Sequence, residues 1–196
     1  SLAQLIISQQ ADVIVVGTML SPSQAAVYGA ASQLTLPLMM AASSVTFVAQ
    51  PMIASLFSQQ DTPRLQSLIR VVTWGSLALA GPVAVVLIAG GPWLLRLYGE
   101  WAPAGYPILV ILTFAQLVVG LMGALAGYLL TMTAHEREAA WIIGLSAVLN
   151  ILLALALTPR FGGVGTACAT LTAALARAVA LGVYVRRTMR LRLPAF

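Results

Sequence analysis

The chain has 196 residues, with ten arginines, no lysine, five acidic residues and a mean hydropathy of +0.96. Only 8% of the residues are charged, against about 25% in ordinary soluble domains, so charge cannot coat a water-facing surface. This composition excludes a water-soluble globule and a disordered chain, and the apolar stretches are too long for the strands of a membrane barrel. We therefore expect an all-α integral membrane protein.

The apolar segments predict six membrane-crossing helices, at about 20 residues for each crossing. In chain order, the predicted spans cover about residues 2–20, 25–57, 64–89, 105–132, 139–157 and 164–185. Polar turns at 133–138 and 158–163 separate the last three spans. We expect the spans to form one six-helix lobe over residues 1–185, followed by a basic cytoplasmic tail over 186–196. The chain opens on Ser1 without a signal peptide, which favours a segment of a longer protein.

The connections between the first spans carry turn and interface signals. Pro37 and Pro51 are expected to bend the second span, whose first turns lie at the membrane surface. Before the third span, Thr62 is the expected N-cap and Pro63 the expected first helical residue. The connection over 90–103 is expected to be a loop whose tryptophans and tyrosine lie among lipid headgroups.

Arginines are divided unequally between the two predicted membrane faces. If both chain ends share a face, the opposite face holds two arginines, Arg96 and Arg160. The shared face then holds seven: Arg64, Arg70, Arg137, Arg186, Arg187, Arg190 and Arg192. Because arginine-rich flanks stay in the cytoplasm, we expect both ends of this segment to be cytoplasmic.

Two charged residues fall deep within predicted spans, where an isolated charge is expensive. Asp12 is about ten residues into the first span, about 15 Å deep, and shares a helix face with Gln9. It either faces a wet cavity or bonds to a neighbouring helix. Arg177 is about eight residues from the end of the last span, where it either lines a cavity for an anion or snorkels to the surface.

Uncharged polar residues inside the spans add to this pattern: Gln33, Gln50, Gln116 and Asn150. Each alone is explained by a hydrogen bond between helices. Together with the two charges they suggest a bundle with a hydrated interior, as in a transporter. The candidate substrate-cavity residues are therefore Arg177, Asp12, Gln9, Gln33, Gln116 and Asn150.

Signals for catalysis and for cofactors are poor. The sequence has no GxxxxGK[ST] loop and no GxSxG elbow, and the His-Glu-Arg-Glu run at 135–138 lacks the second histidine of HExxH. The single cysteine, Cys168, excludes an internal disulfide and a Cys-rich metal site. The net charge of +5 is better explained by a membrane flank than by nucleic-acid binding. We therefore expect no enzymatic activity, cofactor, metal or nucleic-acid partner, and a lipid bilayer as the surroundings.

Four short segments resemble motifs of a known transporter family. Residues 11–17 (ADVIVVG) with 26–31 (AVYGAA) are similar to its D-x-I-x-x-G … G-x-Y-x-x-A opening, with Ala or Val where Gly is usual. Three further segments are similar to P-x-I-x-x-L … G-D, L-x-x-x-G-x-x-R and L-I-P-x-Y-G-x-x-G-A-A: QPMIA at 50–54 with QD at 60–61, LTMTAHER at 130–137 and LTPRFGGVGTA at 157–167. In two of these, Gln60 and Ala134 replace the family's Gly.

Together the segments resemble the C-terminal half of the polysaccharide transporter (oligosaccharide flippase) family, within the multidrug/oligosaccharidyl-lipid/polysaccharide exporter superfamily. The resemblance implies one lobe of a two-lobed, MATE-like transporter in the bacterial cytoplasmic membrane. Such a protein flips undecaprenyl-pyrophosphate-linked oligosaccharide for O-antigen, capsule or exopolysaccharide biosynthesis. The implied partners are that lipid-linked substrate and an N-terminal lobe that this chain lacks.

The resemblance also makes Arg177 the candidate for contact with the pyrophosphate. The cation-coupling Asp of related drug exporters lies in the other lobe, so it is not carried onto Asp12. Two alternatives stay open: a cation-coupled multidrug exporter of the same superfamily and, more distantly, an integral membrane transferase.

Overall fold

The computed structural model describes residues 16–59, 61–123, 127, 129–130 and 136–189, and within these residues it holds helices and no strand. Most of the first predicted span, and the tail from residue 190, lie outside the described residues. Four helical segments are long and apolar enough to cross a membrane: Pro22–Ser58, Thr62–Ala89, Ala102–Leu121 and Glu136–Arg187. The expected all-α membrane architecture is therefore confirmed.

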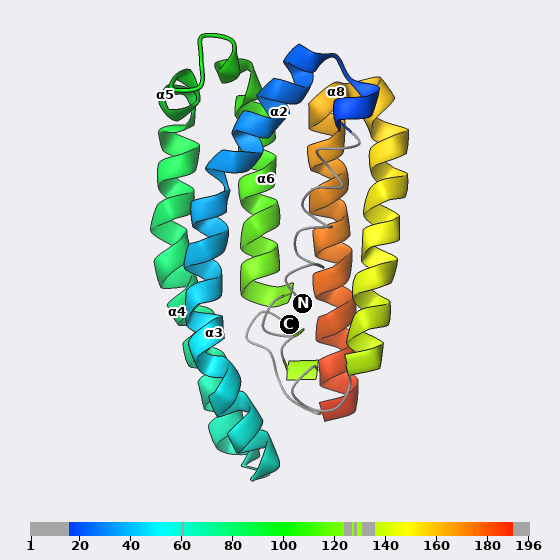
Figure 1. The fold of residues 1–196 in the computed structure, drawn as a ribbon. Coiled ribbons are helices and arrows are strands. Elements are labelled where there is room, and N and C mark those ends of the chain that lie inside the picture. Colours follow the sequence, from blue (N-terminus) through cyan, green and yellow to red (C-terminus); the bar gives the residue numbers. More distant parts are fainter. Residues whose placement is uncertain (1–15, 60, 124–126, 128, 131–135, 190–196) are drawn as a thin grey trace.

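The second predicted span is two helices, not one helix bent at its prolines. α2 covers Pro22–Leu34 and α3 covers Leu36–Ser58, and they meet at Thr35 (Figure 1). Pro37 lies in the first turn of α3, where its missing N–H costs no helical hydrogen bond. The Thr35 hydroxyl donates to the Ser32 carbonyl at 2.7 Å, which satisfies a carbonyl at the end of α2.

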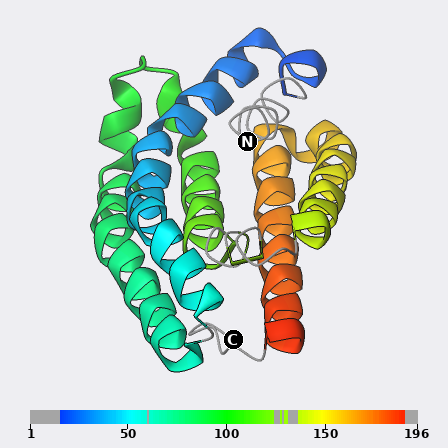
Figure 2. The ribbon, with the colours of Figure 1, turned by 60° about the horizontal axis from the view of Figure 1, so that its bottom comes forward.

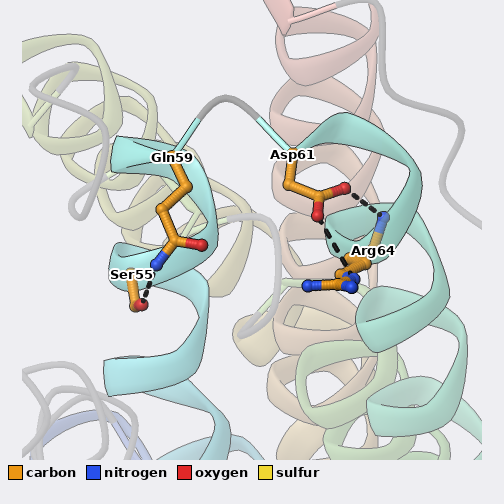
Figure 3. Close-up of polar contacts among 4 residues, drawn as sticks. All are labelled: Ser55, Gln59, Asp61 and Arg64. Atoms are coloured by element: carbon orange, nitrogen blue, oxygen red, sulfur yellow. Dashed lines mark hydrogen bonds and ion pairs between the residues drawn. The ribbon is translucent and has the colours of Figure 1, made fainter.

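α4 covers Thr62–Ala89 and begins one residue earlier than expected. Its N-cap is Asp61 rather than Thr62, because a carboxylate oxygen of Asp61 accepts from the Arg64 backbone N–H at 3.1 Å (Figure 3). The Arg64 guanidinium also lies 3.3 Å from the other carboxylate oxygen. Just before this turn, the Gln59 amide donates to the Ser55 hydroxyl at 3.2 Å.

The connection after α4 is partly helical, which corrects the expected open loop. It contains a short helix, α5 (Gly91–Arg96), and a 3₁₀ turn, η1 (Ala102–Gly105). Between them Gly99 has a φ of 130°, a backbone conformation that favours glycine. The Tyr106 hydroxyl donates to the Ile88 carbonyl at 3.0 Å, which ties the start of the next helix to the end of α4.

The fourth predicted span starts as an α-helix, α6 (Tyr106–Val118), and continues as a π-helical turn, η2 (Val119–Gly123). As far as residue 123, the predicted span over about 105–132 is therefore an α-helix followed by a π turn. Gly120 lies directly against α3, because a Cβ built at position 120 would stand 2.5 Å from the Cβ of Ala42. A glycine is therefore needed for α6 and α3 to approach this closely.

The last two predicted spans form one long helical element, α8 (Glu136–Met189), that folds back on itself at Gly162. Gly162 has a φ of 60° and separates a first arm, residues 136–161, from a second arm, residues 163–189. The turn is shorter than the expected 158–163, because the first arm stays helical through Pro159. Near the bend the buried hydroxyls of Thr158 and Thr166 are hydrogen bonded at 2.8 Å.

In the bundle, α3 and α4 pack side by side, and α6 lies between this pair and the two arms of α8 (Figures 1 and 2). α2 crosses the upper end of Figure 1, where α5, η1 and the bend at Gly162 also lie.

Buried apolar side chains form three clusters along the bundle. The upper core is Val16, Tyr28, Ala30, Ala31, Leu95, Ala102, Ile108, Leu109, Leu112 and Ala167. The middle core is Leu38, Ala42, Ala80, Ala84 and Leu87. The lower core is Ala49, Ile53, Leu65, Ile69, Val72, Leu129, Leu130, Ala139, Leu181 and Val185.

Replacing Gly120 with Ala tests the close approach of α6 to α3. We expect Gly120→Ala to destabilise the protein by about 1–3 kcal/mol, since the added methyl has no flexible neighbour to displace. Adding Ala42→Gly in a double variant should recover much of the lost stability, because the effects of substitutions at two contacting residues are not additive. The measurement is the thermal unfolding midpoint of each variant in one detergent.

Gly144→Ala on the first arm of α8 is the matched control, because a Cβ there meets nothing within 4 Å. In that helix interior alanine should be neutral or stabilising. If Gly120→Ala unfolds at the same temperature as Gly144→Ala, the proposed glycine contact has no energetic role.

Candidate functional site

The depth of Gln116 in the bundle follows from the packing of α6 on the second arm of α8. A Cβ built at Gly163 would stand 2.9 Å from the Cδ1 of Ile108, so these two residues lie at one level. Both helices then run in the same direction, away from the bend (Figure 1). Eight residues further along each helix, Gln116 reaches the level of Leu171. It is partly buried and follows Leu109 and Leu112 on one helix face.

Asn150 is placed by the pairing of the two arms of α8. The hydrogen bond between Thr158 and Thr166 fixes their antiparallel register near the bend. Counting eight residues away from the bend on each arm brings Asn150 level with Ala174. Asn150 is partly buried, on the same face of the first arm as the buried Ala154.

Arg177 lies on the inward face of the second arm. Its neighbours on that face, Ala173, Ala174 and Leu181, are all buried. On the opposite face, Leu175 and Val179 are exposed, as expected for side chains that meet lipid. The guanidinium group is therefore carried inside the bundle, one turn before the lower core begins at Leu181.

Gln116, Asn150 and Arg177 form a band of polar side chains that we call the polar band. Their levels correspond to positions 171, 174 and 177 of the second arm. They therefore span about 9 Å of depth at 1.5 Å per residue. The three come from three different helical segments, which is what a site between helices requires. One permanent positive charge and two amides give this band the chemistry to bind an anion that also carries hydroxyl groups.

Arg177 has no hydrogen-bond or ion-pair partner among the described residues, unlike most hydroxyl groups of the helices. Hydroxyl groups in the helices donate to the carbonyl four residues earlier, as Thr113 does to Leu109 at 2.7 Å and Ser146 to Ile142 at 2.6 Å. No hydrogen bond or ion pair joins Arg177 to another residue of the described chain. A charged group carried inside a membrane bundle normally faces water or a counter-ion.

Among the remaining sequence candidates, the structure describes Gln33 but not Asp12 or Gln9. Gln33 is exposed on α2, at the upper end of the bundle. Asp12 and Gln9 lie outside the described residues. Gln50, partly buried in α3, lies next to Ala49 of the lower core.

Two features of the structure were not predicted from the sequence. The π turn at 119–123 lies at the depth of the polar band and contacts α3, α4 and α8. No residue pattern in the sequence distinguishes a π turn from an α-helix. Ser76 is the second feature: its hydroxyl oxygen is buried in α4 with no hydrogen-bond partner in the described part of the chain.

Acidic residues in the described ranges lie away from the polar band. Asp61, Glu136 and Glu138 are at helix starts, and Glu100 lies between α5 and η1. In the same ranges, no group of three His, Cys, Asp or Glu residues is placed to hold a metal ion. The arrangement offers a positive charge and amides but no constellation for acid–base or nucleophilic chemistry within the described residues.

Comparison with known protein families matches residues 1–156 to the family described as MatE. No curated protein and no solved structure matches the chain. The family match covers the first arm of α8 and the helices before it, so it includes Gln116 and Asn150 but ends before Arg177. It confirms the superfamily that the sequence motifs resemble. The chain therefore belongs to the MatE family of membrane transporters, within the multidrug/oligosaccharidyl-lipid/polysaccharide exporter superfamily.

Proposed function

We propose that this chain forms one lobe of a two-lobed flippase that carries a pyrophosphate-linked oligosaccharide lipid outward across a bacterial cytoplasmic membrane. A second lobe would supply the other wall of the substrate path, and the two would rock to alternate access. The observation that supports the proposal is the inward guanidinium group of Arg177 in the second arm of α8, which has no partner among the residues that the structure describes. Within the proposed path this group contacts the pyrophosphate, and Gln116 and Asn150 contact the sugar hydroxyls.

Arg177 favours an anionic substrate over the cationic drugs of the main alternative. Membership of the MatE family is equally consistent with a cation-coupled multidrug exporter. A fixed positive charge inside the bundle repels organic cations, and low dielectric strengthens that repulsion. The same charge attracts phosphate oxygens, which a planar guanidinium binds through two parallel hydrogen bonds.

Replacing Arg177 separates the two substrate classes. We expect Arg177→Ala to lower lipid-linked oligosaccharide export by about tenfold or more, because hydrogen bonds between charged groups are lost. Arg177→Lys should keep part of the activity, since the charge remains but the bidentate geometry does not. Export of glycan in cells and membrane abundance are measured together. Arg186→Ala, an exposed arginine near the end of the same arm, is the matched control and should export normally.

A structural role for Arg177 predicts a different pattern. If Arg177 pairs with Asp12, the Ala variant should lose abundance, because Asp12 would be left buried and unpaired. Abundance and export would then return together in the Asp12→Ala, Arg177→Ala double variant. Normal glycan export by Arg177→Ala would eliminate the phosphate contact, and export of cationic dyes by the wild type would favour the multidrug alternative.

The proposed orientation in the membrane places both ends of the segment in the cytoplasm. In the structure, Arg64, Arg137, Arg186 and Arg187 lie near helix ends at one end of the bundle, and Arg96 and Arg160 lie near the other. Arginine-rich ends face the cytoplasm, so this distribution supports the proposal.

Accessibility of single cysteines tests this orientation. With Cys168 replaced by Ser, a cysteine at position 98, between α5 and η1, should react with an impermeant thiol reagent added to intact cells. A cysteine at position 59, between α3 and α4, should react only after the membrane is opened. The reverse pattern would place the arginine-rich end outside and overturn the orientation.

A further inference from the structure

Two arginine–tryptophan pairs with the same spacing lie on different helices, and the proposed transport path uses neither. Arg70 and Trp74 belong to α4, and Arg137 and Trp141 belong to the first arm of α8. All four residues are exposed, Trp74 at 63% and Trp141 at 79%. Since residues four apart lie one turn apart on one helix face, each pair presents a charge and an indole side by side.

Both pairs lie beside the lower core. Ile69, next to Arg70, and Ala139, between Arg137 and Trp141, are both members of the lower core. α4 and the first arm of α8 lie on opposite sides of the bundle (Figures 1 and 2). The pairs therefore face the surroundings in two directions, beside the lower core and near the arginine-rich end.

A third arginine, Arg187, lies at the same level as Arg137 of the second pair. The register of the two arms, set by the Thr158–Thr166 hydrogen bond, brings Arg187 level with Arg137. Arg187 is exposed near the end of the second arm. In the described chain, the foot of the α8 hairpin therefore carries guanidinium groups on both of its arms.

These arginines have no acidic partner within the described chain. Arg64 forms an ion pair with Asp61 at 3.3 Å, but no ion pair involves Arg70, Arg137 or Arg187. Glu136 and Glu138 are sequence neighbours of Arg137 and therefore point about 100° away from it around the helix. The charge of the two pairs is available to an external anion.

An apolar stripe continues from Trp141 toward the middle of the bundle. It consists of Leu145, Val148 and Leu152, which follow at three- and four-residue steps and are all exposed. A positive group, an amphipathic indole and an aliphatic stripe thus follow one another along the helix. This order matches the phosphate, the glycerol ester region and the acyl chain of a phospholipid.

We infer that the Arg70–Trp74 and Arg137–Trp141 pairs are binding sites for anionic phospholipids of the leaflet at the arginine-rich end. Each guanidinium group binds a lipid phosphate, and each indole lies at the boundary between headgroup and chain. Occupation on both sides of the bundle fixes the height of the lobe in that leaflet. The phosphate belongs to bilayer lipid, so the sites stay occupied in the absence of any transported substrate.

Quenching of tryptophan fluorescence by brominated lipids tests this inference. The protein is reconstituted into phosphatidylcholine vesicles in which a fixed fraction is replaced by brominated phosphatidylglycerol or by brominated phosphatidylcholine. The signal of Trp141 is obtained by subtracting the Trp141→Phe variant from the wild type, and that of Trp74 in the same way. We expect brominated phosphatidylglycerol to quench each tryptophan about three times as strongly as brominated phosphatidylcholine, or more. The reason is that an arginine near the membrane surface enriches anionic lipid about fivefold.

Charge variants and salt complete the test. Replacing Arg137 and Arg187 together with Gln should abolish the preference at Trp141 and leave it at Trp74, while Arg70→Gln should abolish it at Trp74 and leave it at Trp141. Arg96→Gln, at the opposite end of the bundle, is the matched control and should change neither. In the wild type, high salt should reduce both preferences, a measurement that depends on no variant.

Equal quenching by the two lipids in the wild type overturns the inference, as does a preference that survives both Arg→Gln changes. Absence of quenching by either lipid also overturns it, because the indoles would then be covered by protein.

Discussion

No water competes for hydrogen bonds inside a bilayer, so each backbone N–H and C=O group must find its partner within the protein. The described part of this chain meets that demand with helices and with side chains that return to their own backbone. Thr73 donates to the Ile69 carbonyl at 2.9 Å, and Thr172 to the Cys168 carbonyl at 2.8 Å. Next to Pro37, between α2 and α3, the Thr35 hydroxyl donates a hydrogen bond to the Ser32 carbonyl of α2. Hydroxyl residues thus add polarity to the sequence without adding a binding site.

The same constraint explains why close contacts between helices depend on small residues. Lipid tails are as apolar as leucine, so helices gain from association mainly through tight packing. Gly120 against Ala42 brings α6 onto α3, and Gly163 against Ile108 brings α6 onto α8. α6 is thereby held against α8 near its start, and the π turn that follows it is held against α3. Because α6 also carries Gln116, the packing that holds the bundle together sets the depth of the polar band.

Most of the architecture could be predicted from composition and hydropathy, because a membrane helix needs little more than length and apolar character. The misassigned features depend on local hydrogen bonding. Asp61 caps α4 in place of Thr62, since a carboxylate reaches the Arg64 N–H. The connection after α4 contains helical turns because Gly99, with its positive φ, lets the chain reverse tightly between them. The site was only partly predictable: polarity identified Gln33 and Gln116 equally, but tertiary packing exposes Gln33 on α2 and partly buries Gln116.

The arginines of this chain all carry the same charge, but they differ in their depth in the bundle and in whether an acidic residue pairs with them. Arg64 is paired with Asp61 at the end of a helix, where a charge costs little and contributes little. Arg187 is exposed at the foot of the α8 hairpin, where it is free to meet lipid phosphate. Arg177 lies ten residues, about 15 Å, nearer to the bend on the same arm and faces inward. A side chain at that distance cannot place its guanidinium group among the headgroups with Arg187. A count of arginines by membrane face includes Arg64 and Arg187 and leaves out Arg177, whereas the fold gives the three arginines different surroundings: a helix cap, the exposed foot of the α8 hairpin and the inward face of its second arm. The interior arginine alone requires a partner that the described residues do not supply, and for that reason the proposed transport function depends on it.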